Sequence, residues 1–293
     1  VVTLILAKGV WRMSKKNALV KKLQAVEALG QAQVIAVDKT GTITKNELVI
    51  QKVYVNGKTF DIEGAGYEPK GDIYLDGKLI NPINHPGLFL SGKISAFCAD
   101  ARVILSEDTK QWKVAGDPTE AAMLVFAEKM GINKYSLEQE TPITAEIPFD
   151  YNLKYHAVIH KGEEAMLTVV GAPETILELS ETIWRDGEKY PLTKKEKEKL
   201  ELRVIALSKT SNPPKNLKPE TIHKLTFIGF VGMKDGLRPE VVDAMQKATN
   251  AGIKIVMITG DHKVTAKTIA KEAGIYHDGD LILTGKEIDN LSE

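Results

Sequence analysis

The sequence predicts an α/β fold in which a doubly wound, Rossmann-type domain is interrupted by an α+β insert built on an antiparallel sheet. Two apolar runs, residues 33–37 and 253–258, each end in a polar loop. Such loops follow strands at the carboxyl edge of a parallel sheet, where ligands bind. Between the runs, residues 47–232 show hairpin and helix patterns instead of β-α alternation.

The composition is that of a folded protein with room for two cores. The chain has 293 residues, of which 43% are hydrophobic and 27% charged, both ordinary values. Lys plus Arg and Asp plus Glu each number 39, so no net charge attracts nucleic acid, and no such partner is expected. The one cysteine, Cys98, excludes an internal disulfide and is expected to be a small buried side chain.

The N-terminal residues predict a helix but no membrane span. The apolar run at residues 1–7 is too short to cross a bilayer. Residues 11–29 predict one helix with solvated lysines on one side, ended by Gly30. A start without methionine inside an apolar run indicates a fragment of a longer protein.

The insert has clear turn and helix signals. Asn56-Gly57 and Asp76-Gly77 indicate hairpins, because such dipeptides favour the positive φ angles of tight turns. The remaining patterns predict helices over residues 88–101 and 119–130 and strands over residues 156–160 and 165–170.

The doubly wound pattern resumes after the insert. The pattern changes after residues 226–232, and a helix is predicted from Pro239 to Gly252, with proline at its first position and glycine as its C-cap. The apolar run 253–258 is followed by a helix to about Ala273. These residues form a β-α unit of the predicted parallel sheet.

The first chemical candidate is Asp38, at the point where the run 33–37 stops. Its carboxylate can project from the sheet edge, and Thr40, Gly41 and Thr42 supply donors for phosphate oxygens. An aspartate so placed can attack phosphorus. Asp38 alone could equally cap an ordinary turn, but the full string Asp38-Lys39-Thr40-Gly41-Thr42-Ile43-Thr44 is far more specific.

This string resembles the phosphorylation motif of the P-type ATPases, within the haloacid dehalogenase superfamily, and the resemblance covers essentially the whole chain. It implies a haloacid dehalogenase-like phosphorylation domain, incomplete here, and an aspartyl-phosphate on Asp38 with Lys39 and Thr40 beside it. Soluble phosphatases of the superfamily carry an acid/base aspartate at the position of Thr40. Its absence should let the acyl-phosphate persist.

Two further motifs resemble parts of the same phosphorylation domain. Thr259-Gly260-Asp261 is similar to the loop whose threonine and glycine hold the phosphoryl group and whose aspartate lies near the nucleotide; alone, it could be a capped strand-to-helix turn. Residues 235–239 resemble the returning hinge motif, from which Asp235 and Arg238 carry over, with Gly236 where proline usually stands. The alternative is a simple loop into a helix.

The insert carries motifs that resemble a nucleotide pocket. Residues 116–120 are similar to a motif whose final glutamate, Glu120, lies beside the adenine amino group. Phe149 corresponds to the aromatic residue on which adenine stacks, and Lys154 to a lysine near the nucleotide. A lone phenylalanine is more often a core residue, but the matching order of the three motifs favours stacking.

Two more resemblances complete the predicted pocket. Gly171 begins the motif Gly171-Ala172-Pro173-Glu174, but the lysine that usually precedes this glycine is Val170 here. A positive charge near the nucleotide is therefore missing, which predicts weaker ATP binding or a larger role for Lys154. Arg203 corresponds to an arginine that bridges nucleotide phosphates to the other domain, or is simply an exposed arginine.

Other binding chemistry has little support. There is no Walker-type glycine loop. Of the six histidines, only His156 and His160 come near a metal-ligand spacing, and these two are expected to share a strand face by chance. The predicted cofactors are ATP and Mg²⁺, the latter held by Asp38 and the Thr40 carbonyl together with ATP and water.

The resemblance also implies boundaries and missing parts. Residues 1–12 correspond to the end of a membrane helix and stalk, 13–46 and 233–293 to the two parts of a truncated phosphorylation domain, and 47–232 to the nucleotide-binding domain. The late magnesium-binding aspartate loop, a phosphoryl-binding lysine, the transport helices and the actuator domain would lie elsewhere in a full-length protein.

The predicted role is the ATP-binding, phospho-accepting part of a cation pump of the calcium-type or light-metal subgroup, at the cytoplasmic face of a membrane. Its partners would be ATP, the transported cation and the actuator domain, with no obligate oligomer implied. The fragment alone is expected to bind nucleotide without turnover. A soluble haloacid dehalogenase-like phosphatase and a nucleotide-binding module without turnover remain alternatives.

Overall fold

The structure is a computed structural model that describes residues 2–64, 66–108, 110–194, 205–261 and 263–290. The chain divides into two compact units: unit 1 comprises Val1–Lys45 and Leu237–Glu293, and unit 2 comprises Asn46–Gly236. A small parallel sheet lies in unit 1 and a large, mainly antiparallel sheet is built on unit 2. The predicted mixture of α/β and antiparallel α+β structure is thus confirmed.

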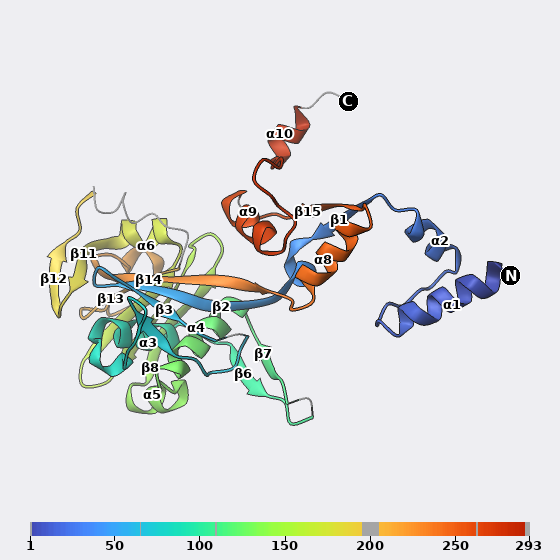
Figure 1. Cartoon of the computed structure of the whole chain (residues 1–293). Coiled ribbons are helices and arrows are strands. Elements are labelled where there is room, and N and C mark those ends of the chain that lie inside the picture. The colour runs from blue at the N-terminus through green and yellow to red at the C-terminus, as the bar shows by residue number, and fades with distance from the viewer. Residues whose placement is uncertain (1, 65, 109, 195–204, 262, 291–293) are drawn as a thin grey trace. The chain divides into compact units, whose positions relative to one another are not determined.

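Unit 1 is organised by the parallel pairing of β1 (Val34–Asp38) with β15 (Lys254–Ile258). The register runs from Val34 opposite Lys254 to Asp38 opposite Ile258, so both strands end at the same edge. Figure 1 shows this pair in blue and orange. The other elements of unit 1 are α1 (Val2–Ser14), α2 (Gln24–Gly30), the turn Lys39–Ile43, α8 (Val241–Asn250), α9 (Lys263–Glu272) and α10 (Gly285–Asp289).

The core of unit 1 covers only one face of the described strands. Val37 and Met257 pack with Val241 of α8 and Ile269 of α9. On the other face Val34 and Ile258 are 55% and 58% exposed. The strand predicted at residues 33–37 is therefore present as β1, with one face covered and the other exposed.

Two helix predictions in unit 1 need correction. The single helix expected over residues 11–29 is two helices, because the chain leaves α1 at Ser14 and Asn17 takes a left-handed φ of 58°. That conformation cannot continue a right-handed helix. The helix expected to open at Pro239 begins at Val241. Among the described helices, none combines the length and hydropathy needed to cross a bilayer.

Unit 2 is built on a sheet with the order β5-β4-β3-β2-β14-β13-β10-β9-β8, in which β11 also pairs with β14, and β12 with β11. The β11–β14 pairing is parallel. The strands of this large sheet are β2 (Thr44–Val55), β3 (Lys58–Ile62), β4 (Ile73–Leu75), β5 (Lys78–Leu79), β8 (Ile143–Asp150), β9 (Tyr155–Lys161), β10 (Ala165–Gly171), β11 (Ser180–Arg185), β12 (Glu188–Pro191), β13 (Ile205–Thr210) and β14 (Leu225–Leu237). A separate hairpin joins β6 (Arg102–Leu105) to β7 (Trp112–Ala115).

The predicted hairpin turns are confirmed. Asn56 and Gly57 connect β2 to β3 with φ angles of 55° and 73°. Asp76 and Gly77 connect β4 to β5 with φ angles of 51° and 74°. Positive φ at both central residues matches the right-handed twist of the flanking strands.

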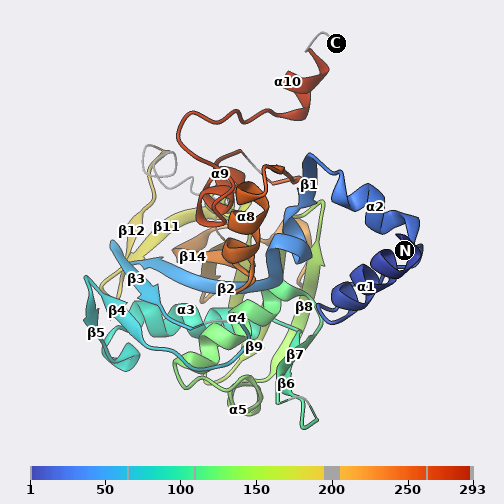
Figure 2. The ribbon, with the colours of Figure 1, turned by 45° about the vertical axis from the view of Figure 1, so that its right-hand side comes forward.

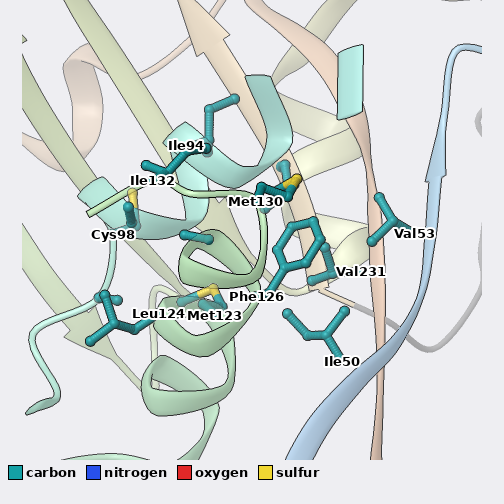
Figure 3. Close-up of a cluster of buried hydrophobic side chains, with 14 of the residues drawn as sticks. Ile50, Val53, Ile94, Cys98, Met123, Leu124, Phe126, Met130, Ile132 and Val231 are labelled. Atoms are coloured by element: carbon teal, nitrogen blue, oxygen red, sulfur yellow. The ribbon is translucent and has the colours of Figure 1, made fainter. Parts of the chain in front are cut away.

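Helices cover both faces of the large sheet. On one face lie α3 (Pro86–Phe97), α4 (Pro118–Lys129) and α5 (Lys134–Glu140), and on the other lies α6 (Pro173–Leu179). Figure 2 shows α3 and α4 against the sheet from a second direction. The larger core joins Phe126 and Met130 to Ile50 and Val231 of the sheet (Figure 3).

Cys98 lies in this larger core, as predicted, and is fully buried. Burial raises the pKa of its thiol to about 12. At neutral pH it is therefore an unreactive, protonated side chain.

Close approach of β10 to β9 requires glycine at position 171. A Cβ there would lie 2.3 Å from the Lys154 carbonyl oxygen, whereas a Cβ on Gly162 would meet nothing closer than 3.4 Å. We expect Gly171→Ala to lower the free energy of unfolding by about 1–3 kcal/mol and Gly162→Ala to change it by less than about 0.5 kcal/mol. Urea unfolding of both variants tests this, and equal effects would contradict it.

Candidate functional site

The loop after β1 presents Asp38 to solvent. The backbone is extended at Asp38 and then folds into the tight turn Lys39–Ile43, in which Gly41 has a φ of 76°. The buried Thr44 hydroxyl closes the turn: it donates to the Lys39 carbonyl at 3.2 Å and accepts from the Gly41 N–H at 3.4 Å. The carboxylate of Asp38 and the exposed Thr40 thus stand at the sheet edge.

Parallel pairing brings a second polar loop to the same edge. Thr259-Gly260-Asp261 follows Ile258, which is the register partner of Asp38. The Lys39 ammonium lies 2.8 Å from Asp261 Oδ2, and the Thr259 hydroxyl accepts from the Asp261 N–H at 3.1 Å. Lys39 is only 7% exposed, so this ion pair keeps a buried cation neutralised. The six residues predicted as catalytic therefore come from two adjoining loops.

Arg238 also belongs to this loop cluster. Its backbone N–H donates to the Ile43 carbonyl at 3.0 Å, and its guanidinium donates to the Gly41 carbonyl at 2.8 Å. The side chain predicted to contact the nucleotide thus supports the loop that follows Asp38. Asp235, by contrast, is nearly buried in unit 2, where it accepts from the Glu47 N–H at 3.1 Å.

In unit 2 the motif at residues 116–120 forms the start of α4. Asp117 is the N-cap, and its Oδ1 accepts from the N–H groups of Thr119 and Glu120 at 2.7 and 3.2 Å. One oxygen of the Glu120 carboxylate accepts from the N–H groups of Asp100 and Ala101 at 2.9 and 3.1 Å. Burial raises the pKa of Glu120, although these bonds oppose the shift.

The predicted stacking residue is accessible. Phe149 lies near the end of β8, is 48% exposed and meets Tyr151 edge-to-face at 5.4 Å between ring centroids. The alternative that Phe149 is a core residue is therefore wrong. An exposed aromatic face on a strand is suited to stacking against a planar base.

Lys154 and the Gly171 motif lie together although they are separate in sequence. The Lys154 carbonyl accepts from the Ala172 N–H at 2.9 Å, and its ammonium lies 3.2 Å from Glu174 Oε1. This ion pair and a backbone bond at Asp150 hold the β8–β9 turn, in which Lys154 takes a left-handed φ of 59°. Gly171 itself serves the close approach of the two strands.

Val170, which stands where the family lysine is expected, is 3% exposed and pairs directly with His156 of β9. Its side chain is part of the larger core. The missing cation is thus replaced by an apolar surface beside a histidine. The predicted role of Arg203 lies outside the described residues.

Comparison with known proteins now identifies the family. Residues 91–240 match the family described as "P-type ATPase, cytoplasmic domain N". The chain belongs to the P-type ATPases. It is 38% identical over 99% of its length to cation-transporting ATPase pma1 of Synechocystis sp. and 36% identical over 100% to the calcium-transporting ATPase of Bacillus subtilis. Human calcium-transporting ATPase type 2C member 1 is 34% identical over 99% of the chain.

The chain covers 34%, 34% and 32% of these three relatives, that is, about a third of their length. This P-type ATPase chain is the cytoplasmic nucleotide-binding part of such an ATPase. The resemblance inferred from the motifs, including its calcium-type subgroup, is confirmed.

Sequence reasoning missed one cluster in this P-type ATPase. Ligand atoms of Asp100, Glu146 and His156 all lie within 4.8 Å of one another, close enough to hold a metal ion. The Lys134 ammonium, 3.6 Å from Asp100, competes for that carboxylate. The cluster joins a loop to two strands, so no local spacing reveals it. The only sequence feature that pointed to this cluster was His156, a histidine on a predicted strand to which no motif gives a role.

His156 and His160 both belong to β9, four residues apart, and therefore share a face as predicted. Their surroundings differ. His160 stacks on Phe97 with ring centroids 3.7 Å apart, and burial lowers its pKa to about 4. His156 instead lies 2.8 Å from the Glu146 carboxylate.

The Asp117 cap determines how α4 presents Glu120. We expect Asp117→Ala to lower the free energy of unfolding by about 1 kcal/mol, because two N–H groups of the first turn lose their acceptor. Asp117→Asn should be nearly neutral, since asparagine caps equally well. Chemical denaturation measures both. An equal loss in the two variants would show that the charge of Asp117, rather than its capping oxygen, stabilises the helix.

Proposed function

We propose that this chain binds ATP and accepts its terminal phosphoryl group on Asp38 as part of an ATP-driven cation pump. The observation that carries the proposal is the shared sheet edge, where Asp38 meets the Thr259–Asp261 loop and Lys39 pairs with Asp261 at 2.8 Å. The relatives described as cation- and calcium-transporting ATPases support the coupling to transport.

The proposed transfer is an in-line displacement. A carboxylate oxygen of Asp38 forms a bond to the γ-phosphorus while the bond from that phosphorus to the bridging oxygen breaks, and ADP leaves with the electron pair. Thr259 and Gly260 provide hydroxyl and N–H donors for the phosphoryl oxygens. Arg238 supports the transfer indirectly, because it holds the Gly41 carbonyl in the loop after Asp38.

The residues at this edge provide the type of oxygen ligand that Mg²⁺ prefers, but fewer ligands than the ion needs. The Asp38 carboxylate and the Thr40 carbonyl are the hard oxygen donors that Mg²⁺ prefers, and Asp38 is exposed. The ion needs about six oxygens, so phosphate and water would supply the others. When bound, Mg²⁺ would neutralise charge on the phosphates, while Asp38 supplies the attacking oxygen.

In unit 2 we propose that adenine stacks on Phe149 with its amino group near Glu120. Lys154 and the Gly171 motif would lie along the nucleotide, since they share a backbone bond and an ion pair. Arg203, Asp235 and Arg238 complete the set proposed from the family motifs. Of these, Asp235 is engaged by the Glu47 N–H and contributes through the backbone it holds.

We assign residues 47–232 to nucleotide binding, 13–46 and 233–293 to phosphorylation, and 1–12 to the end of a membrane helix. The whole protein would act at the cytoplasmic face of a membrane with an actuator domain and a cation path. The chain alone is proposed to bind ATP without sustained turnover. Hydrolysis of a small phosphate ester by the chain would favour the phosphatase alternative, which Thr40 disfavours.

In the full-length protein, Asp38→Asn should abolish the phosphoenzyme but keep nucleotide binding, because an amide cannot attack phosphorus. Acid-stable labelling from γ-labelled ATP measures the phosphoenzyme, and calorimetric titration measures nucleotide binding. Label retained in the variant would place the nucleophile elsewhere. Nucleotide binding without label in the wild type would support the alternative of a binding module.

Phe149→Ala should weaken ATP binding to the 293-residue chain by about 1–3 kcal/mol, the usual contribution of a base stacked on an aromatic ring. Tyr135→Ala is the matched control, because Tyr135 is another exposed aromatic, 70% exposed on α5. Calorimetric titration compares them. Unchanged ATP affinity in Phe149→Ala would exclude stacking at this residue.

A further inference from the structure

In unit 2 the imidazole of His156 lies close to two carboxylates, those of Glu146 and Glu120. His156 Nε2 lies 2.8 Å from Glu146 Oε1. Glu120 binds the N–H groups of Asp100 and Ala101 through Oε2 alone. In the middle, the His156 imidazole is 3% exposed, and its Nδ1 has no hydrogen-bond partner among the described residues.

The bond to Glu146 determines which nitrogen of a neutral His156 carries the proton. An ionised carboxylate only accepts hydrogen bonds, so Nε2 donates to it and Nδ1 is left as an acceptor. This acceptor faces Oε1 of Glu120 at 3.9 Å. Two acceptors thus lie 3.9 Å apart, with no hydrogen-bond partner for His156 Nδ1 among the described residues, and a ligand that brings donors would satisfy both.

We infer that His156 selects the base of the bound nucleotide, with its Nδ1 and Oε1 of Glu120 accepting the two N–H groups of the adenine amino group. The inference rests on the nucleotide binding proposed above. An amino group offers two donors on one atom. Hypoxanthine and guanine carry a carbonyl oxygen at the same ring position, which would add a third acceptor to the pair.

Strand register places Glu146 on the same side of the sheet as His156. Glu146 pairs with Val158, and residues two apart on a strand face the same side. The register shifts between Ile147 and Asp150, so alternation does not assign a side to Phe149. Val170, the partner of His156 on β10, offers no charge to compete for the base.

The adenine amino group can bind both acceptors only after a small movement of the Glu120 carboxylate. Two acceptors about 2.9 Å from one amino nitrogen, along its two N–H directions, would be about 5 Å apart. The free oxygen of Glu120 must therefore swing outward by roughly 1 Å. Rotation of the carboxylate about its anchored Oε2 would both provide this spacing and uncover His156 Nδ1.

Calorimetric titration of the 293-residue chain with ATP and with ITP, whose base is hypoxanthine, tests the inference. The wild type should prefer ATP by about tenfold, and His156→Leu should weaken ATP about three- to tenfold while leaving ITP unchanged. His156→Gln, which retains a donor and an acceptor, should keep most of the preference. His223→Leu, a change at an exposed histidine of unit 2, should alter neither affinity.

An undiminished preference for ATP in His156→Leu, or an equal loss of both nucleotides, would overturn the inference while the proposed function stands. Failure of the wild type to bind either nucleotide would overturn both. Imidazole ¹⁵N shifts of the wild type give a readout that does not depend on a variant folding. The Nδ1 resonance of His156 should move with ATP but not with ITP. A resonance unmoved by ATP would also overturn the inference.

Discussion

The in-register parallel pairing of β1 with β15 is the constraint on which the arrangement of unit 1 depends. It joins segments that the whole of unit 2 separates in sequence, and it ends both strands at one edge. Because the register is set residue by residue, a shift of one position would turn Asp38 to the other side of the sheet. Lys39 and Asp261 reinforce this register, since a nearly buried ammonium is tolerated only beside its counter-charge.

A similar dependence on register holds in unit 2. Pairing of β9 with β10 puts Val170 opposite His156, and pairing of β8 with β9 brings Glu146 to the same histidine. The position from which the family lysine is missing is therefore occupied by packed apolar surface. Lys154 is the described cation that the β8–β9 turn holds near the Gly171 motif.

Several residues that resemble ligand contacts also hold the fold. Asp117 caps α4, Gly171 lets two strands approach, and Arg238 supports the loop behind Asp38. A residue of such a motif can therefore determine local geometry as well as contact a ligand. Substitutions at these positions would change stability and binding together.

The sequence by itself determined the features that depend on local chemistry. Positive-φ dipeptides specified the two hairpin turns, the string at residues 38–44 identified the family, and an apolar run ending in aspartate located β1. Tertiary structure alone decided what depends on distant segments: the exposed face of β1, the break near Asn17, and the grouping of Glu120, Glu146 and His156. Burial and register are sums over neighbours from other parts of the chain, and no local pattern of residues contains them.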